Sequence, residues 1–470
     1  QDFCDQNVSG LASLQAEVSG FDLADVAART GVEDALIIEA ARLFASGPKG
    51  TAITGTGPEM GAHPNLTQHL VSSLNIVCGR FYRAGDRLPN PGMLSPPSPK
   101  VAQVADVAVA WGRGARCRVR PDLGELVTPG RLGPSREMPT AQLADEILTP
   151  GEGQVKALFV IAGNPIMAWP DQEKALAAMK GLELLVCIDP YISATAELAD
   201  YVLAPKLTLE REDVTLLSDA WYEKPYSQYS RAVIESEHDV IEEWELYWAI
   251  ADRMNLEINI GRSVIPNQPK PEKFDLLKAI TNGSRVDLDW LRDNPGGHIF
   301  EDVVSEVQPG PEGSVSKLKL YPEGVEEEFA ELRAEPGLNA DFPHLLIGFR
   351  SKYVLNSFGH NLPVLKKKSG TTNPAHLHPA DLAALGIEDD DEVQIASAHG
   401  QISAIVKADA KIKPGVIAMH HCWGLSPDKQ GSVRENGANT NLLVSSESDT
   451  QRYTGMTRSS SIPVRIKKSA

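Results

Sequence analysis

The sequence predicts an α/β protein in which a unit with a parallel sheet is followed by a small β-barrel. Two observations carry this prediction. Between residues 157 and 205, apolar runs of strand length alternate with helical segments, as they do in parallel α/β units. From residue 342 onward, short segments with period-two alternation are separated by turn residues, which is typical of small all-β barrels.

The parallel-sheet unit is justified element by element. Its first apolar run, Leu158 to Ile161, is rich in strand formers and too short for a buried helix. The segment 171–181 contains good helix formers and ends in Gly. The predicted elements, in chain order, are strand 157–161, helix 171–181, strand 182–188, short helix 193–200 and strand 201–205.

The strands of this unit end in residues that do not continue a strand. Gly163-Asn164-Pro165 follows the first strand, and Asp189 follows the second. In parallel α/β sheets, ligands bind at the carboxyl ends of the strands. Gly163 would let the backbone approach a phosphate closely, and the carboxylate of Asp189 could accept hydrogen bonds from two adjacent N–H groups. These residues are therefore candidate ligand contacts.

The amino-terminal part repeats the pattern of strand, loop and helix with a weaker signal. A strand is predicted over 51–55, entering a turn with Gly55 and Gly57, and a helix follows over 65–79. The inward face of that helix is predicted to carry Leu66, Leu70, Leu74 and Val77. An earlier helix, over 33–45, places on one face Leu36, Ile37, Ala40, Ala41 and Phe44.

Three regions follow from these patterns. Residues 1–255 form the α/β region, including a Pro- and Gly-rich loop over 84–136. Residues 256–341 mix polar loops with short elements and lead into a linker over 334–343. Residues 342–470 form the barrel, whose alternating pairs are Val393/Ile395, Ile402/Ala404 and Val416/Ala418. Its acidic turn contains Asp390, a residue type that tolerates a left-handed backbone.

Composition excludes some function classes. The chain has 470 residues and a formal net charge of −18, so phosphates repel it and nucleic acid is not an expected partner. No stretch reaches the apolar length of a membrane span. The five scattered cysteines fit a reducing compartment, and we expect a cytoplasmic location. The chain begins at Gln1 without a targeting signal, so we expect it to be part of a longer polypeptide.

The order of five segments makes the chain resemble the molybdopterin oxidoreductases of the dimethyl sulfoxide reductase family, over their carboxyl-terminal two thirds. The segments are GRFYRAGDRLPNPG (79–92), ALFVIAGNPIMAWPD (157–171), the run from LLVCIDP to ERED (184–213), the run from LHPADL to HHCWG (377–424), and the run from NTNLLV to PVRI (439–466). No single segment is decisive, but their shared order is specific. The resemblance covers nearly the whole chain and is weakest over 256–341.

The resemblance implies a cofactor and a set of contacts. The family binds two molybdopterin guanine dinucleotides around a molybdenum or tungsten atom, so this chain would be the cofactor-binding portion of an oxidoreductase for two-electron chemistry on a small substrate. Ile188 and Asp189 would meet a guanine, and Arg211 a phosphate or ribose. A double-psi barrel would cover the pterins. The implied contacts are Thr56, Gly57, Gly163, Asn164, Pro165, Ile188, Asp189, Arg211, Gly348, Arg350, His421, Trp423, Asn441 and Arg458.

Two parts of the family pattern do not occur in this chain. The family usually holds a [4Fe-4S] cluster on four amino-terminal cysteines, and it binds its metal through a Cys, selenocysteine, Ser or Asp further along that region. The resemblance places both before Gln1, so we expect no protein ligand to the metal here and no turnover by this chain alone. A small-molecule substrate and an electron-transfer subunit are the expected partners.

The residues by themselves leave other interpretations open. A scaffold relative without cofactor, as in the large iron–sulfur subunit of the bacterial respiratory NADH dehydrogenase, would share the fold; Gly163-Asn164-Pro165, Asp189 and Asn441 argue against it. The barrel pattern argues against an unrelated nucleotide-binding α/β module. Asp189 could instead cap the turn after its strand, and Asn164 could be an ordinary turn residue. Adjacent His420 and His421 point to opposite faces of a strand, which disfavours a metal site there.

Overall fold

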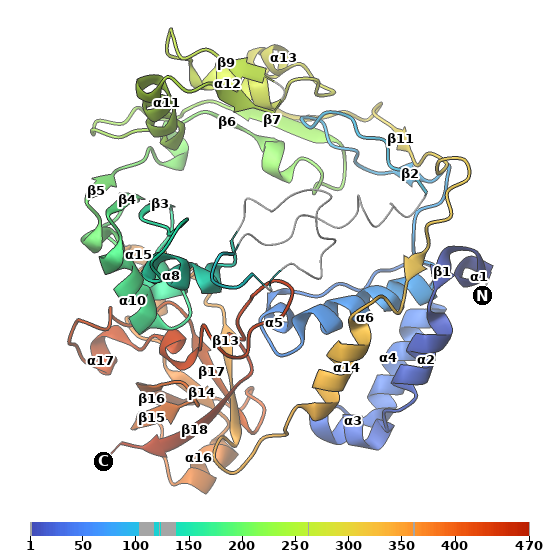
Figure 1. Ribbon diagram of the computed structural model, residues 1–470, viewed down its shortest axis with the longest axis vertical. Helices are drawn as coiled ribbons and strands as arrows, with labels where there is room; N and C mark the ends of the chain where they lie inside the picture. Colours follow the sequence, from blue (N-terminus) through green and yellow to red (C-terminus); the bar gives the residue numbers. More distant parts are fainter. Residues whose placement is uncertain are drawn as a thin grey trace.

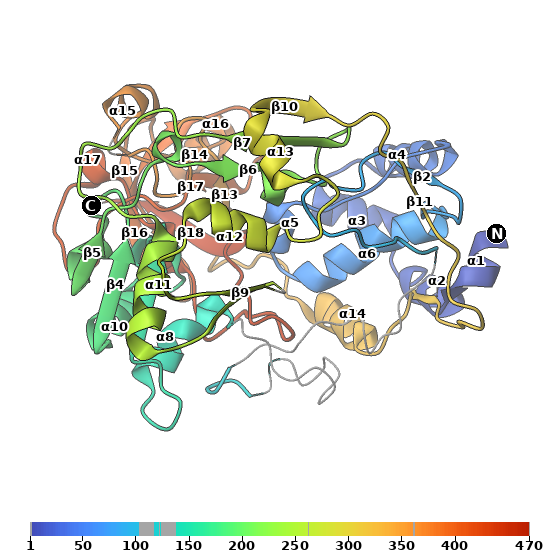
Figure 2. The same ribbon diagram turned by 90° about the horizontal axis from the view of Figure 1, so that it is seen from above.

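The computed structural model describes residues 2–102, 117–121, 123, 138–261, 263–360 and 362–469. Much of the loop predicted over 84–136 therefore lies outside the described residues. In Figure 1 the described elements form a ring, with the amino-terminal helices at the right and the barrel at the lower left. Figures 1 and 2 both place those helices on the side of the molecule opposite to the parallel sheet.

The amino-terminal part is helical, and both helices predicted there are confirmed. Its elements are α1 (Asp2–Asn7), β1 (Val8–Ser9), α2 (Leu11–Val18), α3 (Leu23–Thr30), α4 (Asp34–Ser46), α5 (Thr56–Glu59), α6 (Pro64–Val77) and β2 (Arg87–Leu88). Helix α6 packs against α14 (Val325–Ala334), and Leu66, Ile76 and Phe329 are buried in their common core. Gly79 follows α6 with a φ of 63°, as expected of a glycine that ends a helix.

The strand predicted over 51–55 is not formed, and the prediction is wrong. The backbone of Ala52 pairs with a side chain instead. Its N–H donates to Oδ1 of Asn75 at 2.8 Å, and its carbonyl accepts from Nδ2 of Asn75 at 2.7 Å. No described strand lies beside this segment, and Ile53 is 80% exposed. Without a neighbouring strand, apolar residues of the right type cannot form a ladder.

The apolar faces of the two predicted helices are less buried than their spacing indicates. On α6, Leu74 and Val77 are 47% and 42% exposed, because the face that meets α14 carries Leu66 and Ile76. On α4, no residue is buried, and Leu36 is 52% exposed. A 3.6-residue period defines which residues share a face, but not whether another element covers that face.

The parallel-sheet unit is confirmed. Its elements are α8 (Thr140–Leu148), β3 (Ala157–Ile161), α9 (Pro165–Ala168), α10 (Gln172–Gly181), β4 (Leu184–Ile188), η1 (Ala196–Leu198) and β5 (Tyr201–Leu203). The strands are parallel in the order β3-β4-β5, with Ile161 opposite Ile188 and Ile188 opposite Leu203. The short helix predicted over 193–200 is reduced to the single 3-10 turn η1. All three strands therefore end at one edge.

Residues 206–341 form a more irregular region that returns the chain to the amino-terminal helices. Its elements are η2 (Thr208–Glu210), β6 (Asp213–Val214), η3 (Thr215–Ser218), β7 (Tyr226–Ser230), α11 (Glu243–Met254), β8 (Ile258–Ile260), β9 (Ser263–Ile265), α12 (Lys273–Ile280), α13 (Leu288–Asp293), β10 (Gly296–Ile299), β11 (Ser305–Glu306), β12 (Leu318–Lys319) and α14. Met93 and Leu94, from the predicted loop, are buried here with Phe274 and Leu291. Strands β11 and β12 pair with β2 and β1.

The carboxyl-terminal strands close into a barrel, as the alternation predicts. The elements are β13 (His344–Phe349), α15 (Pro363–Ser369), β14 (Ala375–Leu377), α16 (Pro379–Leu385), β15 (Glu392–Ala396), β16 (Gln401–Ala408), β17 (Val416–His420), α17 (Val433–Asn436), η4 (Thr440–Leu443) and β18 (Ile462–Lys468). The barrel order is β13-β17-β14-β16-β15-β18, closed by pairing of β18 with β13. Val393, Ile395, Ile402 and Ala404 fill its core.

A left-handed turn precedes β15 in the barrel. Asp390 has a φ of 72°, which is the left-handed conformation expected for this acidic turn. Within the described residues, no helix combines the length and the apolar character that a bilayer crossing needs.

Candidate functional site

The turn after β3 is fixed by a short hydrogen-bond chain. Oδ1 of Asn164 accepts from the Thr195 hydroxyl at 2.9 Å, and the same hydroxyl oxygen accepts from the N–H of Ile166 at 3.1 Å. Thr195 is fully buried, so this chain is shielded from water. Pro165 begins α9 at a position where a missing N–H costs nothing. The turn at Gly163-Asn164-Pro165 is thereby held rigidly at the sheet edge.

Asp189 caps the turn after β4. One carboxylate oxygen, Oδ1, accepts from the N–H of Tyr191 at 2.9 Å, while the Asp189 N–H donates to the Leu203 carbonyl at 3.1 Å. Ile188 is buried, and its carbonyl accepts from the N–H of Ala162 at 3.0 Å. Asp189 therefore has the turn-capping role that was the alternative to a ligand role. It uses one oxygen, so it does not exclude contact of the other oxygen with a ligand.

The rim of the barrel brings Gly348, Arg350 and His421 together. Gly348 lies opposite Met419 in the β13–β17 pair, and a Cβ added to Gly348 would meet no atom within 4 Å. The guanidinium of Arg350 donates to Oδ1 of Asn356, and Nε2 of His421 lies 2.8 Å from the same oxygen. Asn356 thus orients both side chains, and the sequence reasoning had not singled it out.

Two buried ring nitrogens at this rim have no hydrogen-bond partner. Trp423 is 4% exposed, and its Nε1 donor is unsatisfied. The ring of His360 lies 4.0 Å from that of Trp423, and Nε2 of His360 is likewise buried and unsatisfied. Such orphaned groups are rare in native interiors and call for a partner. The sequence analysis did not predict a role for His360. The available signal is Gly359, which is typical of a loop, in the segment that follows Arg350.

The rim faces the carboxyl ends of β3 and β4. The rings of Tyr191 and Phe358 lie 6.3 Å apart, and Cys422 is buried in the same core as Cys187 and Ile166. This juxtaposition places the predicted contacts Gly163, Asn164, Pro165, Ile188, Asp189, Arg350, His421 and Trp423 around one region. Side chains from two separate parts of the chain therefore converge there.

Asn441, another predicted contact, lies inside the joint between the two parts. It is 8% exposed, and its Nδ2 donates to the Met167 carbonyl at 3.0 Å. Asn439 donates to the same carbonyl at 3.3 Å, and the Asp171 N–H donates to the Asn441 carbonyl at 3.1 Å. Asn441 thus holds the α9 turn against the barrel, which positions the turn at Gly163 to Pro165.

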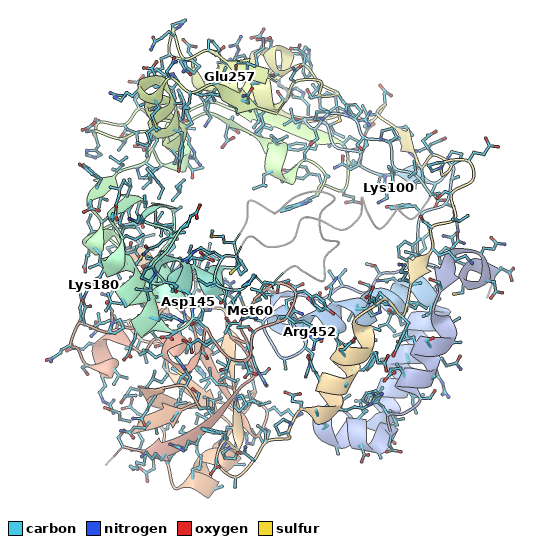
Figure 3. The ribbon with its side chains drawn as sticks, viewed as in Figure 1. Met60, Lys100, Asp145, Lys180, Glu257 and Arg452 are labelled. Atoms are coloured by element: carbon cyan, nitrogen blue, oxygen red, sulfur yellow. The ribbon has the colours of Figure 1, made fainter. Side chains whose placement is uncertain are left out.

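A second group of predicted contacts lies where the α5 turn meets the segment that leads into β18. The N–H groups of Ser459 and Ser460 donate to the Met60 carbonyl at 3.0 and 2.9 Å, which joins the α5 turn to the start of β18. Figure 3 labels Met60, which follows α5, and Arg452, in the segment that leads into β18. Thr56 and Gly57 form the exposed first turn of α5.

Arg458 belongs to this second group. Its guanidinium contacts Oε1 of Glu335 at 3.2 Å and donates to the Ser461 carbonyl at 2.6 Å, but its Nε is buried and unsatisfied. One N–H group of this arginine therefore stays available for an acceptor.

Arg211 is not brought to these groups. It lines a cavity of about 480 Å³ together with Lys206, Trp244 and Lys270, and none of the other predicted contacts lines it. The guanidinium of Arg211 lies 3.2 Å from Oε2 of Glu243, while its Nε is buried and unsatisfied. The partner, Glu243, is the first residue of α11. The sequence pattern does not indicate that the start of α11 lies beside Arg211.

Burial keeps the imidazoles of the rim neutral. It lowers the pKa of His421, and the nearby positive charge of Arg350 lowers it further. Burial also lowers the pKa of His360 and raises the pKa of the Cys422 thiol to about 11. Near neutral pH, the positive charge of the rim therefore comes from Arg350, while the histidines act as hydrogen-bonding groups.

The barrel should lose stability as the pH falls below the ordinary histidine range. Burial, and then the charges of His376 and His421, lower the pKa of His420 from 6.5 to about 4. Because the unfolded chain binds this proton more readily, the contribution of His420 is complete above pH 6.5 and is lost as the pH falls to about 4. Melting temperatures measured from pH 7.5 to 4 should fall less steeply for His420→Gln; identical slopes would contradict this account.

The arrangement as a whole defines a class of protein. Strand ends of a parallel sheet, glycines open to a ligand, arginines with unused donors and orphaned aromatic N–H groups suit an extended cofactor with phosphates and heteroaromatic rings. The chain is thus a cofactor-binding protein built from an α/β unit and a β-barrel.

Comparison with known proteins identifies the family. The description Molybdopterin oxidoreductase matches residues 52–253, and Molydopterin dinucleotide binding domain matches residues 345–462. The first match covers the parallel-sheet unit, and the second covers the barrel. The chain therefore belongs to the molybdopterin oxidoreductase family, as the resemblance of the sequence predicts.

Individual relatives are distant and longer than this chain. It is 25% identical to NADPH-Fe(3+) oxidoreductase subunit alpha of Geobacter sulfurreducens over 91% of this chain and 45% of that protein. It is 26% identical to acetylene hydratase of Syntrophotalea acetylenica, over 59% and 38%. The dimethyl sulfoxide reductase DmsA of Escherichia coli is 23% identical, over 85% and 51%. The chain thus spans about half or less of the length of these relatives.

A solved structure shares the fold. Acetylene hydratase from Pelobacter acetylenicus superposes with a TM-score of 0.75 and 20% sequence identity, covering 100% of this chain and 67% of that one. The similarity of fold therefore extends over the irregular region 206–341, including residues 256–341, where the sequence resemblance is weakest.

Proposed function

We propose that this chain is the cofactor-binding part of a molybdenum or tungsten oxidoreductase that binds two molybdopterin guanine dinucleotides. The observation that carries the proposal is the pair of orphaned nitrogens on Trp423 and His360, at the rim that faces the strand ends. The family membership of both matched regions supports the same cofactor. The relatives reported above carry the names of enzymes, which gives no support to a scaffold without cofactor.

The residues present fit the proposed group. The second carboxylate oxygen of Asp189 would accept from the N–H groups of a guanine, beside the buried Ile188. The backbone at Gly57 and Gly163 would lie against the dinucleotide, and the free donor of Arg458 would meet a phosphate oxygen. Arg211, which pairs with Glu243 through one terminal nitrogen, would use its unsatisfied Nε toward a phosphate or ribose.

The barrel rim would hold the pterin. Gly348 leaves open space beside it, and Arg350, oriented by Asn356, would donate hydrogen bonds to its polar edge. The N–H of His421 is directed at Asn356, so this imidazole would accept a hydrogen bond through its other ring nitrogen. When bound, the cofactor supplies the two-electron redox chemistry of the metal. The side chains of this chain bind and orient it, and the buried joint around Asn441 excludes water from one flank.

Further parts of the proposal concern the whole protein. We propose the double-psi connectivity for the barrel, in which β13 pairs in parallel with β17 and β14 with β16. We also propose a [4Fe-4S] cluster in a region outside this chain and an electron-transfer subunit as partner; several relatives are named as alpha subunits. All five cysteines are free, which supports a reducing, cytoplasmic compartment.

Replacing Trp423 by Phe tests this proposal. The change removes one N–H donor and keeps most of the apolar contact. A neutral hydrogen bond contributes about 0.5–1.5 kcal/mol, so cofactor retention should fall about threefold to tenfold. The smaller ring should lower the stability of both forms by a similar amount, while the loss of the donor should affect only the cofactor-bound form, since Nε1 of Trp423 has no partner in the empty protein. Nucleotide released per chain and melting curves with and without cofactor give both values; unchanged retention would count against the proposal.

A further inference from the structure

We propose that His63, Glu328 and Glu331 form a site for one divalent transition-metal ion, separate from the proposed cofactor site. Each side chain offers one ligand atom, and the three atoms lie within 4.8 Å of one another. No other described group of three His, Cys, Asp or Glu side chains has this arrangement. The proposal does not depend on the proposed function, because its test needs neither cofactor nor turnover.

The fold brings these residues together from two helices. His63 immediately precedes α6 and has a left-handed backbone, with a φ of 51°. Glu328 and Glu331 are one turn apart on α14, so both project from the same side of that helix. Helices α6 and α14 pack through Leu66 and Phe329, which fixes the distance between the imidazole and the two carboxylates.

Glu328 is the buried acid of the three proposed ligands. It is 5% exposed and forms no ion pair with a described residue. Its Oε1 accepts one hydrogen bond, from Nε2 of Gln451 at 3.3 Å. A buried acid aimed at an imidazole and a second acid is suited to a metal ion.

His63 supplies an independent indication. Its Nε2 is buried and makes no hydrogen bond. The nitrogen lies 3.4 Å from Oε2 of Glu335, within ion-pair range but without hydrogen-bond geometry. The unsatisfied nitrogen of a half-buried imidazole is therefore free to act as a ligand.

The donor set indicates the class of ion. One imidazole nitrogen and two carboxylates favour Zn²⁺, Mn²⁺ or Fe²⁺, whereas Ca²⁺ and Mg²⁺ prefer oxygen ligands alone. Ligand atoms at about 2.0–2.2 Å from one zinc ion lie within about 4.4 Å of each other. The observed limit of 4.8 Å exceeds this slightly, and rotation of the exposed Glu331 can cover the difference.

Binding of the ion would have to displace a neighbouring arginine from one of the ligands. Arg452 pairs with Glu331, and their side chains are 34% and 46% exposed. Arg29 and Arg458 both pair with Glu335, so they are not directed at the proposed ion. The exposed pair of Arg452 and Glu331 is weakly held, and the ion would replace Arg452. Arg452→Gln should therefore strengthen metal binding.

The ion would join α6 to α14 close to the α5 turn. Met60, which follows α5, accepts hydrogen bonds from Ser459 and Ser460, and Arg458 contacts Glu335 on α14. A metal here would act as a structural clamp between the start of α6 and α14.

Zinc titration of the full chain by calorimetry, without cofactor, tests the proposal. The wild type should bind one Zn²⁺, and His63→Gln, Glu328→Gln and Glu331→Gln should each weaken binding at least about tenfold. Glu327→Gln is the matched control, because Glu327 is an exposed acid on the same helix. Circular dichroism checks that each variant is folded.

A spectroscopic measurement keeps the test independent of variant folding. Wild type loaded with Mn²⁺ should give a nitrogen coupling in pulsed electron paramagnetic resonance, from the imidazole of His63. Absence of stoichiometric zinc binding, or a bound Mn²⁺ without nitrogen coupling, would overturn the proposal. So would equal zinc affinity of the three ligand variants, Glu327→Gln and the wild type.

Discussion

Gly424→Ala should lower the free energy of unfolding by about 3 kcal/mol or more. Gly424 follows Trp423 with a φ of 88°, which costs any residue with a Cβ about 1–3 kcal/mol. An added Cβ would also lie 2.7 Å from the backbone nitrogen of Asn439 and 3.0 Å from the carbonyl carbon of Ala438. Those atoms are backbone and cannot rotate away, so the segment that carries Asn439 and Asn441 must move.

Gly386→Ala is the matched control for this prediction. Gly386 has a φ of 65°, but a Cβ there would meet no atom within 4 Å. It should therefore show only the backbone cost, about 1 kcal/mol. Denaturant unfolding of both variants measures the difference. Equal losses in the two variants would mean that the close approach of Gly424 to Asn439 does not constrain the barrel.

Asp189→Asn should weaken retention of the cofactor at least about tenfold, because a charge-assisted contact contributes about 1.5–3 kcal/mol. In the proposed site, the second oxygen of Asp189 accepts from a guanine N–H group. The side-chain amide of asparagine would instead place its own N–H donor against the guanine N–H donor. The turn itself should survive, since an Asn Oδ1 can still accept from the N–H of Tyr191. The loss should therefore appear with cofactor bound and be small in the empty protein.

Asp200→Asn provides the comparison. Asp200 accepts from the N–H of Leu185 at 2.8 Å, at the opposite end of β4, so its role is structural. Its replacement should leave cofactor retention unchanged. Thermal stability and nucleotide content of both variants, with and without cofactor, separate the two roles. Equal stability losses in both forms of Asp189→Asn would leave Asp189 as a turn cap alone.

The sequence predicts local elements well where their own residues decide the outcome. The strand formers of β3, β4 and β5 and the period-two alternation of the barrel give the observed strands. The segment 51–55 has similar residues but forms no strand, since strand formation needs a partner that the described residues do not provide. The predicted burial of Leu74 is not observed for a related reason, because α14 covers a different face of α6.

The candidate site is predictable only in part. Gly163 to Pro165 and Asp189 are visible because breakers at strand ends are a local signal. Asn356 and His360 were missed because their roles come from contacts with Arg350, His421 and Trp423 in space. Arg211 was placed beside the cofactor by resemblance, yet its pairing with Glu243 depends on where α11 lies.

The central claim is that this chain binds a molybdenum or tungsten pterin cofactor. The most direct test is elemental analysis combined with nucleotide release by acid hydrolysis. The protein that contains this chain would be purified in full length from a cell that makes the cofactor. The account predicts about one atom of molybdenum or tungsten and about two guanine nucleotides per polypeptide. Well-folded protein with neither metal nor guanine nucleotide would contradict it.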